Sequence, residues 1–255
     1  MVAANNKYAL TCQYDGTLYK GFQSQINEHT IQEKIENSLY KINNGKINIE
    51  YAGRTDSGVH ATHQVIAFEI KWNHSKIKLE NAINAYLPND ILVKNIKKVQ
   101  SLFHPRKDAI SRTYEYKISQ AKVQNLFDRN YVYHYPYKLN ISKIRSAIKV
   151  LEGRHDFKNF CKSENISDNC IRDLYSVSIH RENEILIFKF KGSSFLRHQI
   201  RFMIGYILQI GRNKLDINEL ESLLDGKNKV KSIVKHNVSP RGLCLTLVEY
   251  HGFSF

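Results

Sequence analysis

The feature that most constrains the fold of this chain is an order of short apolar segments that runs once and then begins again. In the first run, apolar positions alternating at a period of two predict strands, and apolar positions spaced i, i+3, i+4 predict helices. The strands are expected at 8–14, 49–53, 64–71 and 91–99, with one helix opening at a Thr30–Glu33 capping box and another around 79–87. The predicted order is β-α-β-β-α-β.

The same order restarts after His104-Pro105-Arg106. Strands are expected at 108–119, 171–180, 184–192 and 243–250, and helices at 141–151, 195–211 and 216–224. Two copies of a split β-α-β unit place two antiparallel sheets side by side and leave a cleft where they meet. The sequence therefore predicts an α/β (α+β) fold of two pseudo-symmetric, ferredoxin-like halves, residues 1–105 and 106–255.

The charge of the chain favours a polyanionic partner. Lysine and arginine number 38 against 24 acidic residues, which gives a formal net charge of +14. Such a field attracts nucleic acid, although a solvated surface rich in lysine gives the same count. The basic residues recur along the whole chain, which favours a folded binding surface over a basic tail.

The cysteine pattern and the hydropathy indicate a soluble protein of a reducing compartment, expected in the cytoplasm. The four cysteines form no CxxC pair and have no zinc-ligand spacing, so free thiols are expected. No signal-peptide pattern is present at residues 1–7, and no apolar run approaches the roughly 18 residues of a transmembrane helix. No membrane partner is predicted.

One candidate for chemistry is Asp56, which stands between Gly53 and Gly58 in a segment that joins two predicted strands. Glycines let the backbone turn sharply and approach a ligand closely, which suits a catalytic carboxylate. The alternative is an ordinary turn, because Asp-Ser-Gly favours turns in its own right.

A second candidate group lies on the helix predicted at 195–211, which is apolar around most of its circumference and is therefore expected to be buried. Arg197, His198 and Arg201 interrupt it, with the two arginines one turn apart on one face. A guanidinium at the edge of a core needs an anion, and a carboxylate is expected for Arg201. Arg197 either reaches water or contacts a phosphate.

Tyr114 is the third candidate. Period two places Arg112, Tyr114 and Tyr116 on one face of the strand predicted at 108–119, where a tyrosine is either a core residue or a platform for a base.

A set of motifs in order along the chain resembles the TruA family of tRNA pseudouridine synthases. The run AGRTDSGVHATHQV is similar to the active-site loop of that family. Further similar blocks are Tyr14-Asp15-Gly16-Thr17, Gly21-Phe22-Gln23, Phe103-His104-Pro105-Arg106, Arg112-Thr113-Tyr114, Asp156-Phe157, the run from Ser194 to Arg201, and Gly242-Leu243. Such an ordered set is far more specific than any single motif.

The resemblance implies a role for each matching residue. Asp56 is the expected catalytic aspartate, paired with Arg201, and Arg54 is expected to contact the RNA and hold the flipped nucleotide out. Tyr114 is expected to stack on the target uracil and to assist proton removal. The remaining residues expected to bind substrate are Leu243, Arg197, His198 and Arg106.

The resemblance also implies a reaction and an assembly. The expected activity isomerises uridine to pseudouridine in tRNA, around positions 38 to 40 of the anticodon stem-loop in bacterial relatives, with no cofactor and no metal. A homodimer and a central RNA-binding cleft are expected. Whether the aspartate attacks C1′ or stabilises charge there stays open.

Three positions depart from the family pattern and leave the substrate range open. Phe22 stands where tryptophan is usual, on a loop expected to touch RNA. His63 stands where glycine is commoner, and Phe202 where asparagine is frequent.

Two alternatives remain. Asp56, His60 and His63 form D-x3-H-x2-H, a ligand set for a zinc-dependent hydrolase. A non-catalytic RNA-binding module on the same fold is the other.

Overall fold

The protein divides into two compact units in a computed structural model that describes residues 6–161, 169–225 and 236–255. Unit 1 comprises Met1–Ile110 together with Cys244–Phe255, and unit 2 comprises Ser111–Leu243. The C-terminal segment thus belongs to the first unit, whereas the sequence placed it in the second half. Within the described ranges, no helix is both long and apolar enough to cross a membrane.

Unit 1 is a split β-α-β unit with one antiparallel sheet. Its elements are β1 (Asn6–Tyr14), α1 (Ile31–Asn43), β2 (Glu50–Tyr51), β3 (His60–Ile70), α2 (Lys76–Tyr86) and β4 (Ile91–Lys98). The strands pair in the order β4-β1-β3-β2. At the start of β3, β10 (Leu243–Tyr250) adds a short parallel pairing, Cys244 with His60. The predicted order β-α-β-β-α-β is confirmed for this unit.

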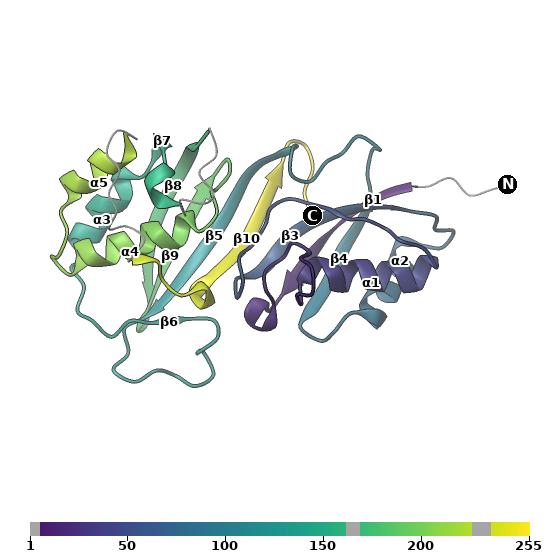
Figure 1. Cartoon of the computed structure of the whole chain (residues 1–255), viewed down its shortest axis with the longest axis horizontal. Helices are drawn as coiled ribbons and strands as arrows, with labels where there is room; N and C mark the ends of the chain where they lie inside the picture. The colour runs from purple at the N-terminus through teal and green to yellow at the C-terminus, as the bar shows by residue number, and fades with distance from the viewer. Residues whose placement is uncertain (1–5, 162–168, 226–235) are drawn as a thin grey trace. The chain divides into compact units, whose positions relative to one another are not determined.

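Local sequence explains where the two helices of unit 1 begin and which face they bury. The Thr30 side chain accepts a hydrogen bond from the Glu33 amide at the start of α1, and Ser75 caps α2 in the same way. The residues buried from these helices are Ile31, Ile35, Leu39, Leu79 and Ile83. In Figure 1, α1 and α2 lie together against β1, β3 and β4.

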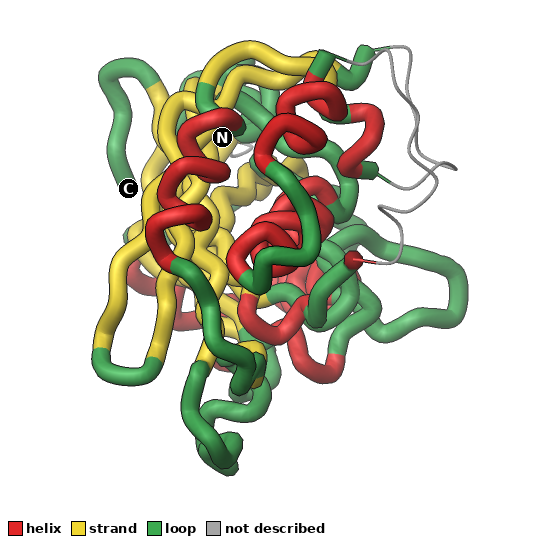
Figure 2. Tube along the Cα trace, turned by 90° about the vertical axis from the view of Figure 1, so that its left-hand side faces the viewer, coloured by secondary structure: helices red, strands yellow, loops and turns green. Residues whose placement is uncertain are grey.

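Unit 2 repeats part of the strand pairing of unit 1. Its elements are β5 (Ala109–Ser119), β6 (Tyr133–His134), α3 (Ile141–Val150), β7 (Gly153–Asp156), β8 (Ile171–Glu182), β9 (Ile185–Gly192), α4 (Gln199–Gly211) and α5 (Ile217–Leu224). The sheet order is β5-β9-β8-β7, antiparallel throughout, with β6 parallel to the end of β5. Figure 2 faces this unit and shows its helices beside its strands.

The two units therefore share a topology, which confirms the predicted mixed α+β fold. In each unit the first long strand pairs with the third strand of the motif, and the third pairs with the second: β1-β3-β2 in unit 1 and β5-β9-β8 in unit 2. The halves 1–105 and 106–255 stay a prediction about domain structure.

The start predicted for the helix at 195–211 is wrong. His198 has a left-handed backbone, with φ of 65°, so α4 begins at Gln199 and its first bond joins the Phe202 amide to the His198 carbonyl. Before it, the Leu196 amide donates to the Gln199 side chain, Oε1, at 2.7 Å. Arg197 therefore precedes the helix, and the predicted shared face of Arg197 and Arg201 does not exist.

We expect Thr30→Ala to lower the free energy of unfolding by about 1 kcal/mol, because the Glu33 amide at the start of α1 loses the buried hydroxyl that accepts its hydrogen bond. The matched control is Ser75→Ala, which removes the cap of α2 at an exposed position where water replaces the lost acceptor. Urea unfolding of both variants measures the difference. An equal loss in both would contradict a special role for the buried cap.

Candidate active site

The segment that carries Asp56 connects β2 to β3 in unit 1 and turns tightly at the aspartate. The Asp56 carbonyl accepts a hydrogen bond from the Val59 amide at 3.1 Å, and Gly58 takes a positive φ of 75°. Asp56 is half-buried, while Arg54 is exposed on the same segment. The loop thus presents a carboxylate and a cation two residues apart.

A neighbouring segment of unit 1, residues 19–22, fastens this loop through backbone bonds. The Phe22 amide donates to the Thr55 carbonyl at 3.1 Å, and the Gly58 amide donates to the Tyr19 carbonyl at 3.2 Å. The Ser57 hydroxyl also donates to the Tyr19 carbonyl, at 3.2 Å. The backbone on both sides of Asp56 is therefore held.

Gly21 makes this close approach possible. Its φ is 101°, and a Cβ at this position would lie 2.8 Å from the Thr55 carbonyl oxygen. A side chain would be both strained and crowded there, so glycine is required for segment 19–22 to lie against the loop.

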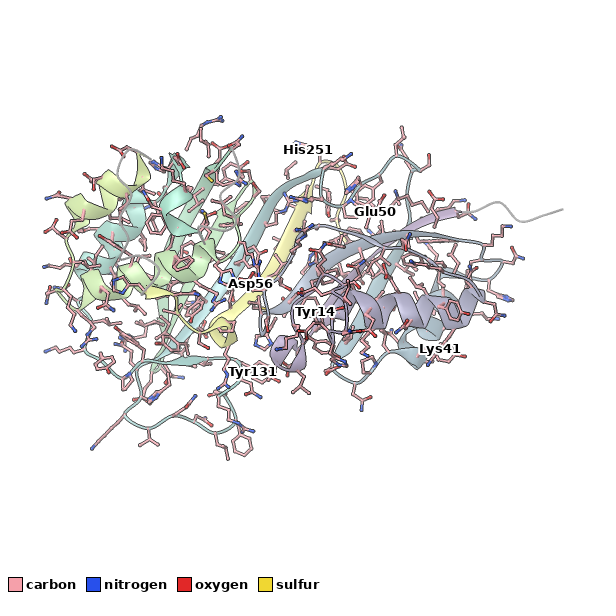
Figure 3. All side chains as sticks on the ribbon, in the orientation of Figure 1. Tyr14, Lys41, Glu50, Asp56, Tyr131 and His251 are labelled. Carbon is pink, nitrogen blue, oxygen red and sulfur yellow. The ribbon has the colours of Figure 1, made fainter. Side chains whose placement is uncertain are left out.

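A side-chain bond joins the same loop to the end of β1. The hydroxyl groups of Tyr14 and Thr55 lie 2.8 Å apart, both buried (Figure 3 labels Tyr14 and Asp56). Phe22 is fully buried, with its ring 5.8 Å from Tyr14 and 4.6 Å from Tyr51. The ring of Phe22 thus lies in the core of unit 1, and the contact of its loop with RNA stays a prediction.

The two histidines of the alternative zinc site have other partners. His60 Nδ1 accepts a hydrogen bond from the Gly16 amide at 3.1 Å and lies 3.2 Å from Asp15 Oδ1. His63 Nδ1 accepts from the Val248 amide at 3.4 Å, and burial lowers the pKa of its ring. Among the residues that the structure describes, no cluster of three histidine, cysteine, aspartate or glutamate side chains can hold a metal ion.

Arg201 lies in unit 2, within the first turn of α4, and is 9% exposed. Its Nε donates to the Val238 carbonyl at 2.8 Å, and its Nη1 lies 3.1 Å from His198 Nδ1. The guanidinium is thus oriented by a backbone carbonyl and an imidazole of its own unit. Its predicted burial is confirmed, and a carboxylate partner stays a prediction.

Gly205 allows the carbonyl of Val238 to reach Arg201. One turn along α4 from Arg201, a Cβ on Gly205 would lie only 1.5 Å from the His236 carbonyl oxygen. The segment 236–238 therefore runs directly over the helix backbone. The sequence motifs gave no signal of this contact.

The predicted face of β5 is confirmed for its three polar members. Arg112, Tyr114 and Tyr116 are all buried, at 7%, 8% and 0% exposure. The Tyr114 ring meets the Phe195 ring edge to face at 5.2 Å. Arg112 Nη1 donates to the Ser193 carbonyl at 2.7 Å.

Tyr116 contacts the segment 239–242, which directly precedes Leu243. Its hydroxyl donates to the Ser239 carbonyl at 2.7 Å, and burial raises its pKa well above the ordinary value, so this donor stays protonated. A Cβ on Gly242 would lie 3.1 Å from the Tyr116 ring. Leu243, the residue expected to wall the pocket, follows directly and is 5% exposed.

The structure brings only some of the predicted site residues together. Arg54 and Asp56 share a loop of unit 1, and His198 and Arg201 are in contact in unit 2. Arg106 and Arg197 are exposed. The pairing of Asp56 with Arg201 joins residues of different units and stays a prediction.

Comparison with known proteins decides the family. A family profile described as tRNA pseudouridine synthase matches residues 11–108 and 147–251. The tRNA pseudouridine synthase A of Streptococcus pyogenes serotype M49 (strain NZ131) is 39% identical over 247 residues, which cover 96% of this chain and 98% of the relative. The protein of the same name from serotype M1 matches equally well.

The chain belongs to the tRNA pseudouridine synthase family. The resemblance to the TruA family that the motifs indicated is thereby confirmed, and the chain is an enzyme of the isomerase class. Among solved structures, the archaeal box H/ACA sRNP Nop10-Cbf5 complex covers 91% of this chain and 60% of its own, at 13% identity and a TM-score of 0.35. That likeness is too weak to add to the assignment.

Arg201→Ala is expected to lower the free energy of unfolding by about 1 to 3 kcal/mol, because the Val238 carbonyl loses its charged donor in a buried setting. Arg197→Ala is the control and should change stability by less than about 0.5 kcal/mol, since that side chain is exposed. Urea unfolding of both variants checks this. Equal stability of Arg201→Ala and the wild type would contradict the orienting role of Val238.

Proposed function

We propose that this enzyme isomerises uridine to pseudouridine in the anticodon stem-loop of tRNA, around positions 38 to 40, with Asp56 as its catalytic carboxylate. The observation that carries the proposal is the Asp56 loop, which lies within the range matched by the family profile, resembles the active-site loop of the family, and has its backbone held on both sides of the aspartate. A site that must act on one atom of a large RNA needs such a fixed carboxylate.

The reaction breaks the bond between N1 of uracil and C1′ of ribose, turns the base, and joins C5 to C1′. The hydrogen on C5 leaves as a proton and N1 gains one, so atoms balance without an oxidant. Asp56 either attacks C1′ or stabilises the positive charge that develops there. The other residues have to hold the detached base and the RNA while this happens.

The roles proposed for the other residues follow from their chemistry and from the family resemblance. Arg54 is exposed beside Asp56, which suits a contact with the RNA backbone. Tyr114 offers a ring on which the extruded uracil stacks, which offsets the cost of flipping by about 1 to 3 kcal/mol. Arg201 is proposed to pair with Asp56, and Leu243 to wall the pocket.

The charge of the chain supports a tRNA partner. A net charge of +14 favours phosphate contacts spread over a large surface, to which exposed Arg106 and Arg197 and the half-exposed His198 can contribute. By the same family resemblance we expect a cytoplasmic homodimer.

Asp56→Ala is expected to abolish pseudouridine formation and to leave tRNA affinity within about threefold of wild type, because phosphate contacts dominate binding. Pseudouridine mapping of tRNA transcripts after incubation with each protein tests this. Wild type should give a new signal around positions 38 to 40 and Asp56→Ala none. Turnover by Asp56→Ala, or modification elsewhere by wild type, would contradict the proposed catalyst or the proposed specificity.

Chelators should leave the rate unchanged, since the proposed reaction routes no step through a metal. The measurement is release of tritium from C5-labelled tRNA before and after dialysis against EDTA. Loss of activity that zinc restores would instead favour the alternative site of Asp56, His60 and His63.

A further inference from the structure

The hydroxyl pair of Tyr14 and Thr55 has no role in the reaction described above. Tyr14 ends β1 and is 4% exposed, and Thr55 is 7% exposed, with 2.8 Å between their oxygen atoms. Thr55 is the residue directly before Asp56. The hydrogen bond from Tyr14 therefore connects the sheet of unit 1 to the residue next to the proposed catalytic carboxylate.

We infer that Tyr14 is a positioning residue. Its hydroxyl holds Thr55, and through Thr55 it holds the Asp56 carboxylate in position. This inference rests on the proposed function, because it assumes that Asp56 is the group whose position matters. Tyr14 itself is not proposed to touch the substrate.

Thr55 is held at two separate points. Its carbonyl accepts the Phe22 amide, and its side chain bonds to Tyr14. The first bond holds the backbone of Thr55, and the second ties its side chain to the end of β1. Together the two bonds limit how far the backbone that leads into Asp56 can shift.

The hydroxyl of Tyr14 comes from a rigid part of unit 1. Tyr14 pairs with Ala61 in the β1-β3 ladder, and its ring packs against Phe22. A site that is supported by a strand is held more accurately than one supported by loops alone. Because a misplacement of about 1 Å can cost on the order of a hundredfold in rate, even a partial loss of this support should be visible in the chemical step.

The test is a double-mutant cycle with Tyr14→Phe and Thr55→Val, which delete one hydroxyl each and keep the shape of the side chain. Each single variant should lower the single-turnover rate of tritium release from C5-labelled tRNA by about tenfold, and the double variant should lose no more than either single one. tRNA affinity should stay unchanged. Thr55→Ser keeps a hydroxyl and should recover most of the rate.

Thr11→Val is the matched control. Thr11 lies three residues earlier on the same strand, is fully buried, and donates its hydroxyl to the Lys94 carbonyl at 3.0 Å. It should lower the free energy of unfolding as Tyr14→Phe does, with no change in the single-turnover rate. A rate loss in Thr11→Val as large as that in Tyr14→Phe would assign the effect to general destabilisation and overturn the inference.

Other results of the same experiment distinguish a failure of the Tyr14 inference from a failure of the proposed function. An unchanged rate in Tyr14→Phe, or additive losses in the double variant, overturns the inference while wild-type turnover upholds the function. Absence of product with wild type overturns both. If Tyr14→Phe does not fold, Thr55→Val against Thr55→Ser carries the same test, and equal rates in those two overturn the inference.

Discussion

The candidate site depends first on the register between β1 and β3. Tyr14 at the end of β1 pairs with Ala61 at the start of β3, after an irregularity in the ladder between Cys12 and Tyr14. Because the strands are antiparallel, the chain leaving β1 and the chain entering β3 emerge at the same end of the sheet. Segment 19–22, which follows β1, and the Asp56 loop, which precedes β3, therefore start from neighbouring positions at this end of the sheet.

Most of the secondary structure could be predicted because local chemistry and burial agree. Thr30 marks a helix start that the structure keeps, and alternating apolar residues gave the long strands. The errors came where a backbone conformation contradicted the side-chain pattern. His198 adopts a left-handed conformation that apolar periodicity cannot reveal. Strand β3 begins earlier than predicted because His60 and Ala61 pair with β10 and Ala61 also pairs with Tyr14 of β1.

The candidate site was predictable as a set of residues but not as a set of contacts. The motif containing Asp56 and the cation at Arg201 are visible in the sequence, since a charge in an apolar helix demands a partner. A backbone carbonyl and an imidazole are among the partners of Arg201, and a carbonyl leaves no trace in a motif. The burial of the Phe22 ring, which lies in the core of unit 1 although the residue stands on a loop, could not be predicted from the motif either.

The Asp56 loop is held by backbone bonds and by the side-chain bond between Tyr14 and Thr55, and a substitution can remove this side-chain bond alone. The side-chain bond can therefore be tested by mutation. The bonds from Phe22 and Gly58 use backbone atoms, so they survive most changes of side chain, although Gly21 is required for its lack of a Cβ. The bond between Tyr14 and Thr55 depends on two hydroxyl groups. The backbone bonds set the path of the loop, whereas the hydroxyl pair ties the side chain of the residue before the carboxylate to the sheet. A fold can therefore keep the path of this loop and still lose the accuracy with which Asp56 is presented.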